Sequence, residues 1–339
     1  MEKKDADIVI YTTGDVENLE RILNTLHTTE FPFDFNILIQ NHGSQKIVNL
    51  NKYPKVERYV WQSKKGNKVL DLCVSPIIIK LDDTMDIFRL NLLACMTTRR
   101  EDNKVHDLVP KDIDVCVTTY NRKTDLEAIL NALNEQKGVD FNVIVNDDGS
   151  KELIEPHQFP VLNTYLWAKD IGFTKVARVN ESVLMCPSDN ILLLDGDAIP
   201  VGYNFLQKHV NNLRSMHVSY GRALWFDKML VCTPANMAFQ KKNLIKSYGL
   251  YPVVYNGHYG HEDTDVWNEI RYLQLTTVLT DATVKLTSQS YSAENMLVDI
   301  KRNHTICKKR WGGWRNFYWR KLEKLRNWYT GKKIDNNTN

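Results

Sequence analysis

The sequence predicts an α/β fold in which helices flank a mostly parallel central sheet, built as two unequal units. Two observations support this prediction. An apolar β-branched run, a helical pattern and a second apolar run follow one another at "DIVIYTT" to "FNILI" and again at "DVCVTT" to "FNVIV". That order is typical of a parallel βαβ unit, and its recurrence indicates an internal duplication.

The repeat keeps one register over a long stretch. Shifting residues 7–26 by 107 positions gives eight identities in twenty, and shifting residues 34–44 by 106 positions gives five in eleven. The second shift also places "YVW" (59–61) on "YLW" (165–167). We therefore expect three parts, which are a degenerate, non-catalytic α/β unit at about 1–105, a complete catalytic domain at about 110–305 and a basic aromatic tail at 306–339.

Composition narrows the class of protein. With 43% hydrophobic and 25% charged residues, the chain resembles an ordinary soluble globular protein. No apolar run approaches the roughly 18 residues of a membrane span, and "MEKKDADIVIY" lacks a signal-peptide core, so we expect a cytoplasmic protein. The six cysteines form no CxxC pair, so we expect most to be buried and reduced, without a zinc site or disulfide framework.

Acidic residues follow two of the predicted strands in the second copy. In "LLLDGDAIP", Asp195 and Asp197 lie two positions apart, and an extended backbone would point both carboxylates to the same side. Such a pair suits Mg²⁺ or Mn²⁺, although in isolation a solvated Asp-Gly turn is the better explanation. In "NDDGS", Asp147 and Asp148 could bind a base or a ribose hydroxyl, or they could simply start a turn.

A third acidic cluster lies in "GHYGHEDTDVWNEIR", where Glu262, Asp263 and Asp265 enter a predicted helix. The helix dipole stabilises acids at this position, which is one sufficient explanation. Three acids and two histidines after a glycine-containing loop also make a suitable place for a general base.

From about residue 112 to residue 313 the chain resembles nucleotide-sugar glycosyltransferases of the GT-A fold, most closely family 2. The resemblance rests on the order and spacing of "TTYNR" (118–122), "NDDGS" (146–150), "GFTKVARVNESV" (172–183), "ILLLDGDAIP" (191–200), "GHEDTDVWNEIR" (260–271) and "KKRWGG" (308–313). It implies a Rossmann-like catalytic domain that transfers a sugar from a nucleotide donor, expected to be UDP-linked, by a single inverting displacement.

The resemblance also implies roles for single residues. Asp195 and Asp197 would be the DxD pair that holds Mn²⁺ or Mg²⁺, and Asp263, or else Glu262, would deprotonate the acceptor. The residues expected at the nucleotide are Thr118, Tyr120, Arg122, Asp147, Asp148, Arg178 and Asp195. The residues expected at the acceptor are His261, Asp265 and Trp311.

The chain departs from the family pattern at one metal ligand. Relatives usually have a histidine after the acidic cluster, whereas this chain has Ser288 and Gln289 in the matching stretch. Either the metal has fewer protein ligands or His304 folds back to it.

The tail carries twelve Lys or Arg against one acid between residues 301 and 333, in an amphipathic helical pattern from about Trp314. It could dock on the catalytic domain, lie on an anionic membrane near lipid-linked acceptors, or contact nucleic-acid phosphates.

The expected acceptor is a glycan or lipid-linked glycan, with a hydroxylated base in DNA as the alternative. A non-catalytic sugar-nucleotide or glycan-binding protein is the third class. The protein would be cytoplasmic or peripheral to the membrane.

The first copy lacks the acids of the second. Asn41 and His42 stand where the second copy has Asp147 and Asp148, and Thr84 stands where it has Asp197. We expect a nucleotide-binding half that lost its ligand and braces the catalytic domain or helps to hold the acceptor.

Overall fold

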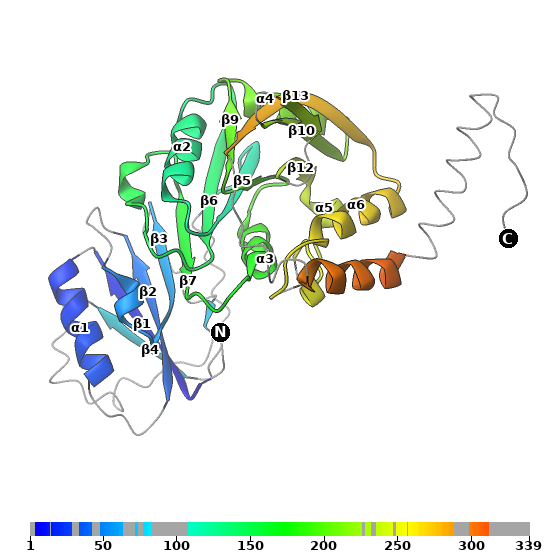
Figure 1. Cartoon of the computed structure of the whole chain (residues 1–339). Coiled ribbons are helices and arrows are strands. Elements are labelled where there is room, and N and C mark those ends of the chain that lie inside the picture. Colours follow the sequence, from blue (N-terminus) through cyan, green and yellow to red (C-terminus); the bar gives the residue numbers. More distant parts are fainter. Residues whose placement is uncertain are drawn as a thin grey trace, which may run out of the picture.

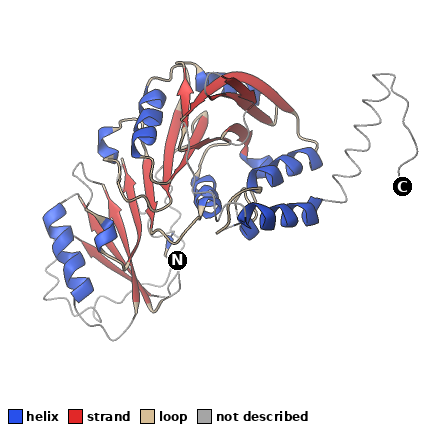
Figure 2. Ribbon diagram, in the orientation of Figure 1, coloured by secondary structure: helices blue, strands red, loops and turns tan. Residues whose placement is uncertain are grey.

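A computed structural model describes residues 4–13, 15–28, 34–42, 48–63, 72–73, 77–82, 108–225, 228–231, 235–246, 249–255, 257–287 and 298–311. These residues form one mixed sheet with helices on both faces (Figures 1 and 2). Its strand order is β4-β1-β2-β3-β7-β6-β5-β8-β12-β10-β13-β9, and β11 pairs with β10. The predicted α/β class with a large, mostly parallel sheet is confirmed.

The strands are β1 (Ala6–Thr12), β2 (Phe35–Asn41), β3 (Val56–Gln62), β4 (Ile77–Asp82), β5 (Ile113–Thr119), β6 (Phe141–Asp147), β7 (Thr164–Ala168), β8 (Asn190–Asp195), β9 (Ala198–Val201), β10 (Val218–Trp225), β11 (Lys228–Val231), β12 (Asn236–Gln240) and β13 (Thr277–Leu286). The helices are α1 (Val16–Thr28), α2 (Lys123–Asn134), α3 (Lys175–Met185), α4 (Phe205–Leu213), α5 (Lys241–Leu244) and α6 (Glu262–Tyr272), with short 3-10 turns η1 (Leu50–Lys52), η4 (Pro156–Gln158) and η5 (Val253–Tyr255). Residues 298–311 are also helical.

Two four-stranded parallel blocks make up most of the sheet. The N-terminal block has the order β4-β1-β2-β3, and the second block has the corresponding order β8-β5-β6-β7. The blocks meet where β3 pairs with β7 in antiparallel orientation. The two predicted units therefore share one continuous sheet instead of packing as separate bodies.

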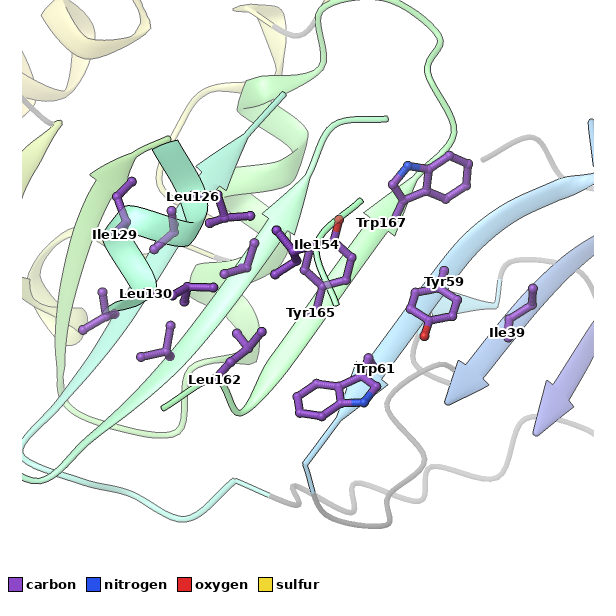
Figure 3. Packing of buried hydrophobic residues seen from close by; sticks show 14 of the residues in the cluster. Ile39, Tyr59, Trp61, Leu126, Ile129, Leu130, Ile154, Leu162, Tyr165 and Trp167 are labelled. Carbon is purple, nitrogen blue, oxygen red and sulfur yellow. The ribbon is translucent and has the colours of Figure 1, made fainter. Parts of the chain in front are cut away.

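We call this β3–β7 pairing the seam. Across it, the three central facing pairs are Tyr59–Trp167, Val60–Leu166 and Trp61–Tyr165. Tyr59 and Trp61 of β3 lie beside Tyr165 and Trp167 of β7, and all four are buried (Figure 3). The repeat makes Tyr59 equivalent to Tyr165 and Trp61 equivalent to Trp167. Each strand therefore contributes the same aromatic residues to the seam in a two-fold symmetric arrangement, as in an isologous interface between identical subunits.

The hydrogen bonds at the ends of the seam follow the same symmetry. Ser63 donates its backbone N–H to the Asn163 carbonyl at 3.0 Å, and Lys169 donates to the Glu57 carbonyl at 3.2 Å. A shift of 106 positions converts the first bond into the second with donor and acceptor roles kept.

The two faces of the sheet carry separate hydrophobic cores because strand side chains alternate between faces. One core packs α1, α2 and α4 against the sheet and runs without interruption across the seam. The other packs α3, α5, α6 and the helix at 298–311 on the opposite face. Buried Ile8 and Ile10 belong to the first core, and Val9 between them belongs to the second.

Two further expectations have partial outcomes. The four cysteines within the described ranges (Cys73, Cys116, Cys186 and Cys307) are free and buried. None of the helices that the structure describes is both long and apolar enough to cross a membrane. The tail beyond Trp311, and Thr84, lie outside the described residues.

Candidate active site

The carboxyl ends of β5, β6 and β8 meet at one edge of the sheet, since these parallel strands are neighbours. In the register, Thr118 of β5 lies opposite Asp195 of β8, and Thr119 lies opposite Asp147 of β6. Ligands bind outside this edge in open parallel sheets. Half-buried Thr118 and exposed Tyr120 therefore lie where the sequence predicts nucleotide contacts.

The Asp195-Gly196-Asp197 segment is pressed against the end of β5. A Cβ added to Gly196 would lie 2.9 Å from both the Thr118 carbonyl oxygen and the Thr119 Oγ1. Only glycine fits this close approach. Both aspartates are half-buried, and burial, followed by the charge of Asp195, raises the pKa of Asp197.

Lys175, at the start of α3, links this segment to the third acidic cluster. Its Nζ lies 3.0 Å from Asp195 Oδ1 and 3.7 Å from Glu262 Oε1. Although burial opposes the charge, Asp195, Asp263 and Glu262 together raise the pKa of Lys175 well above its usual range. Sequence reasoning assigned no role to Lys175, because a single lysine in "GFTKVARVN" carries no signal until the fold places it between two groups of acids.

Glu262 and Asp263 begin α6, as predicted. Glu262 is 3% exposed and its Oε2 has no hydrogen-bond partner within the described ranges. Burial, and then the charge of Asp263, raises the pKa of Glu262 to about 7. Asp263 is half-buried and accepts a 2.7 Å hydrogen bond from the Tyr251 hydroxyl, and burial raises its pKa as well. A raised carboxyl pKa suits a general base.

The residues available to a metal ion are the two aspartates. No group of three or more His, Cys, Asp or Glu side chains that could hold a metal occurs among the residues described. Mg²⁺ and Mn²⁺ are commonly bound by one or two carboxylates, with substrate phosphates and water completing the shell. Asp195 and Asp197, held close by Gly196, fit such an ion when a phosphate donor is present.

The structure does not bring His304 into that pair. His304 lies on the helix at 298–311, where its ring packs against His261 with centroids 5.0 Å apart. His304, the predicted third metal ligand, therefore contacts the loop before α6 in this structure.

The "NDDGS" turn is tightly constrained. Asp147 accepts hydrogen bonds from the Ser150 N–H at 2.7 Å and the Tyr165 hydroxyl at 2.6 Å, and burial raises its pKa to about 6. Asp148 accepts hydrogen bonds from the backbone N–H of Thr174, at 2.8 Å, and from the Thr174 hydroxyl. Both carboxylates are thus anchored to their own domain, and each fixes a loop at the site edge.

The two arginines expected at the nucleotide are also held by acids. Arg178 is 6% exposed, lies 3.7 Å from Asp148 and 2.8 Å from Glu181, and so adjoins the turn. Arg122 forms an ion pair with Asp125 at 3.1 Å.

The three residues expected at the acceptor are not grouped together. His261 adopts a left-handed backbone (φ 67°) just before α6, next to the acids. Asp265 is fully buried, where it accepts hydrogen bonds from Tyr255 at 2.6 Å and Arg310 at 2.9 Å. Trp311 packs edge-on against Tyr272, at the far end of α6. Asp265 and Trp311 therefore join α6 to the helix at 298–311 in this structure.

Asn303 ties that helix to the loop before α6. Its buried side-chain amide donates to the carbonyl oxygens of His258, Tyr259 and Gly260 at 3.2, 3.2 and 2.8 Å. His258 also pairs with Asp299 at 2.9 Å. These contacts fix the loop that precedes Glu262.

Parts of the chain are similar to known proteins. Over 93 residues the chain is 36% identical to a hyaluronan synthase from Pasteurella multocida, a match that covers 26% of this chain and 10% of that protein. A mannosyltransferase from Pyrobaculum calidifontis, solved with GDP-Man and Mn²⁺, is 15% identical with a TM-score of 0.42, covering 54% of this chain and 59% of that one. TarS from S. aureus with UDP-GlcNAc is 16% identical with a TM-score of 0.40, covering 55% and 60%.

The match to a sequence family is the most direct comparison. Residues 114–257 match the profile described as "Glycosyl transferase family 2", which covers the strand-end edge, the two aspartates and Lys175. This segment of the chain is therefore similar to glycosyl transferase family 2.

Proposed function

We propose that this protein is a metal-dependent glycosyltransferase that moves a sugar from a nucleotide-sugar donor, UDP-linked in the first instance, to an acceptor hydroxyl. The observation that carries the proposal is the bridge made by Lys175 between Asp195 and Glu262. It brings the DxD segment and the acids of α6 to one site, so groups for the diphosphate and for the acceptor lie next to each other.

Asp195 and Asp197 would hold the divalent ion. When bound, that ion supplies Lewis-acid stabilisation of the negative charge that develops on the leaving diphosphate. Lys175 adds a fixed positive charge beside the same carboxylates, and Gly196 keeps the segment close to β5. The bond between the anomeric carbon and the diphosphate oxygen breaks as the acceptor oxygen bonds to that carbon.

Asp263 would take the proton from the acceptor hydroxyl. Asp263 is partly exposed and can meet a substrate, whereas Glu262 is 3% exposed. The hydroxyl of Tyr251 orients Asp263, and burial, followed by the charge of Asp195, raises the pKa of Asp263. A base on the acceptor side, opposite the leaving group, favours a single displacement with inversion.

The metal step is tested with the Asp195→Asn/Asp197→Asn double variant. We expect it to lose Mn²⁺-stimulated hydrolysis or transfer across a panel of UDP- and GDP-sugars, while its fold is kept. Asp281→Asn is a matched control, because the Asp281 side chain is 76% exposed and pairs with Lys208 away from the site. A double variant with undiminished activity on every donor that the parent uses would refute the metal role.

For the acceptor we propose a glycan. The partial match to a hyaluronan synthase supports this choice, but the chain spans only about a tenth of that protein. A lipid-linked glycan and a hydroxylated base in DNA are separated by deleting residues 314–339. Loss of binding to anionic vesicles alone would favour the lipid-linked acceptor, and loss of duplex binding alone would favour DNA.

We also propose that residues 4–82 derive from a second copy of the nucleotide-binding half. Three hydrogen bonds that recur at shifts of 106 or 107 positions support this. The Asn36–Asp7 side-chain bond recurs as Asn142–Asp114, and the backbone bond from His42 N–H to the Thr12 carbonyl recurs as Asp148 N–H to the Thr119 carbonyl. The Asn41–Tyr59 side-chain contact recurs as Asp147–Tyr165. In the last pair the contact is kept but the hydrogen bond is reversed: the Asn41 amide donates to the Tyr59 hydroxyl at 2.7 Å, whereas the Tyr165 hydroxyl donates to Asp147 at 2.6 Å. Binding of a sugar nucleotide at Asn41 and His42 would contradict the loss of the ligand.

A further inference from the structure

A row of alternating charges runs from the N-terminal unit to the "NDDGS" turn. Arg58 of β3 lies 3.9 Å from Glu181 of α3, Glu181 lies 2.8 Å from Arg178, and Arg178 lies 3.7 Å from Asp148. None of these four side chains is more than 14% exposed. The row begins in one unit and ends at a predicted nucleotide-binding residue of the other.

Glu181 is the central member of the row. Its carboxylate also accepts a 3.0 Å hydrogen bond from the Asn146 amide, at the end of β6. Burial alone would raise the pKa of Glu181, but Arg58 and Arg178 together hold it below its usual range. Removing one partner of such a buried network leaves an uncompensated charge, so its neighbours must move or take up water.

The β3–β7 pairing holds Arg58 beside Glu181. Arg58 faces Ala168 across the β3–β7 pairing, and its backbone is therefore fixed relative to the second unit. The repeat places Thr164 at the equivalent position, and a threonine cannot make the reciprocal ion pair. The seam is symmetric in its aromatic residues but not in this charge contact, because only the N-terminal unit contributes an arginine to the other unit.

We propose that Arg58 is a positioning residue for the nucleotide site: through Glu181 it fixes the guanidinium of Arg178 beside Asp148. This inference rests on the proposed function, because it assumes that the edge formed by these residues receives the nucleotide. It gives the N-terminal unit a specific task, which is to supply the charge that holds Glu181, and through it Arg178, in place beside a site that the N-terminal unit does not itself contain.

The test compares full-length Arg58→Gln, Arg58→Lys and Glu57→Gln proteins. Glu57 is a matched control because it also forms an ion pair across the seam, with Lys169 at 3.2 Å, yet is not part of the charge row. The readouts are the Kd for UDP with Mn²⁺, the KM and kcat for the donor, and hydrogen exchange of residues 174–182 without ligand.

We expect Arg58→Gln to raise the Kd for UDP and the donor KM about tenfold, with kcat within about threefold, and to speed exchange at 174–182. Arg58→Lys, which keeps the charge and is the fallback if the glutamine variant does not fold, should show a smaller effect. Glu57→Gln should lower thermal stability without changing either nucleotide parameter.

An unchanged Kd and unchanged exchange in Arg58→Gln, or equal effects in Glu57→Gln, would overturn the inference. Failure of the proposed function has a different signature. If the parent binds neither UDP nor GDP, the donor assignment is wrong, whereas exchange at 174–182 still decides whether Arg58 orders α3.

Discussion

Gly149 and Gly172 provide a direct test of how the "NDDGS" turn is built. Both have a positive φ, 96° and 98°, so alanine at either position adopts a strained backbone at a cost of about 1–3 kcal/mol. Their surroundings differ. A Cβ on Gly149 would lie 2.6 Å from the Asp170 backbone, whereas a Cβ on Gly172 would meet nothing within 4 Å.

The difference between the two alanine variants isolates the steric contact, since the backbone strain and the loss of unfolded-state freedom are common to both. Overpacking adds about 1–3 kcal/mol, so we expect Gly149→Ala to be less stable than Gly172→Ala by about that amount. Urea denaturation measures it as a lower midpoint at constant slope. Equal destabilisation would refute the close packing of the turn on Asp170.

Four further predictions concern the site. Asp263→Asn should lower kcat about 10²–10⁴-fold with little change in donor KM, and near-normal kcat would exclude it as the base. Because burial raises the pKa of Glu262 to about 7, this acid stabilises the fold most at low pH, and that contribution is lost as pH rises through 7. Urea titrations should therefore show a weaker pH dependence of stability for Glu262→Gln than for the parent. Equal pH dependence in the two proteins would mean that another group is responsible. Lys175→Met removes a cation that lowers the pKa of Asp263, so the acidic limb of the pH–rate profile should move to higher pH, and an unmoved limb would contradict the bridge. Asn303→Ala leaves three carbonyls without their donor and should cost about 1–3 kcal/mol and raise the acceptor KM, with the exposed Lys301→Ala as control.

The fold was largely predictable because its signals are local. Strand and helix periodicities in the repeat gave β1, α1, β2 and their counterparts β5, α2, β6 near their observed bounds. The seam was not predicted. Antiparallel pairing of β3 with β7 depends on which strand edges remain open after each unit forms, and "YVW" and "YLW" report only that the two strands are alike.

The site was predictable only in part. Asp195, Asp197, Glu262 and Asp263 stand out as acids at element ends, and the structure places them at one edge of the sheet. Trp311 shows the limit of such reasoning, because an aromatic residue in a family motif can serve packing or binding, and only its contact with Tyr272 distinguishes them.

The seam also bears on how the chain avoids self-association. Without it, β3 and β7 would each end a parallel block with a row of unpaired backbone N–H and C=O groups, which are templates for strand addition by another molecule. Pairing them within one chain removes both exposed edges at once. A mutation that parts the two strands would therefore be expected to appear first as aggregation of the whole protein, before any loss of sugar transfer.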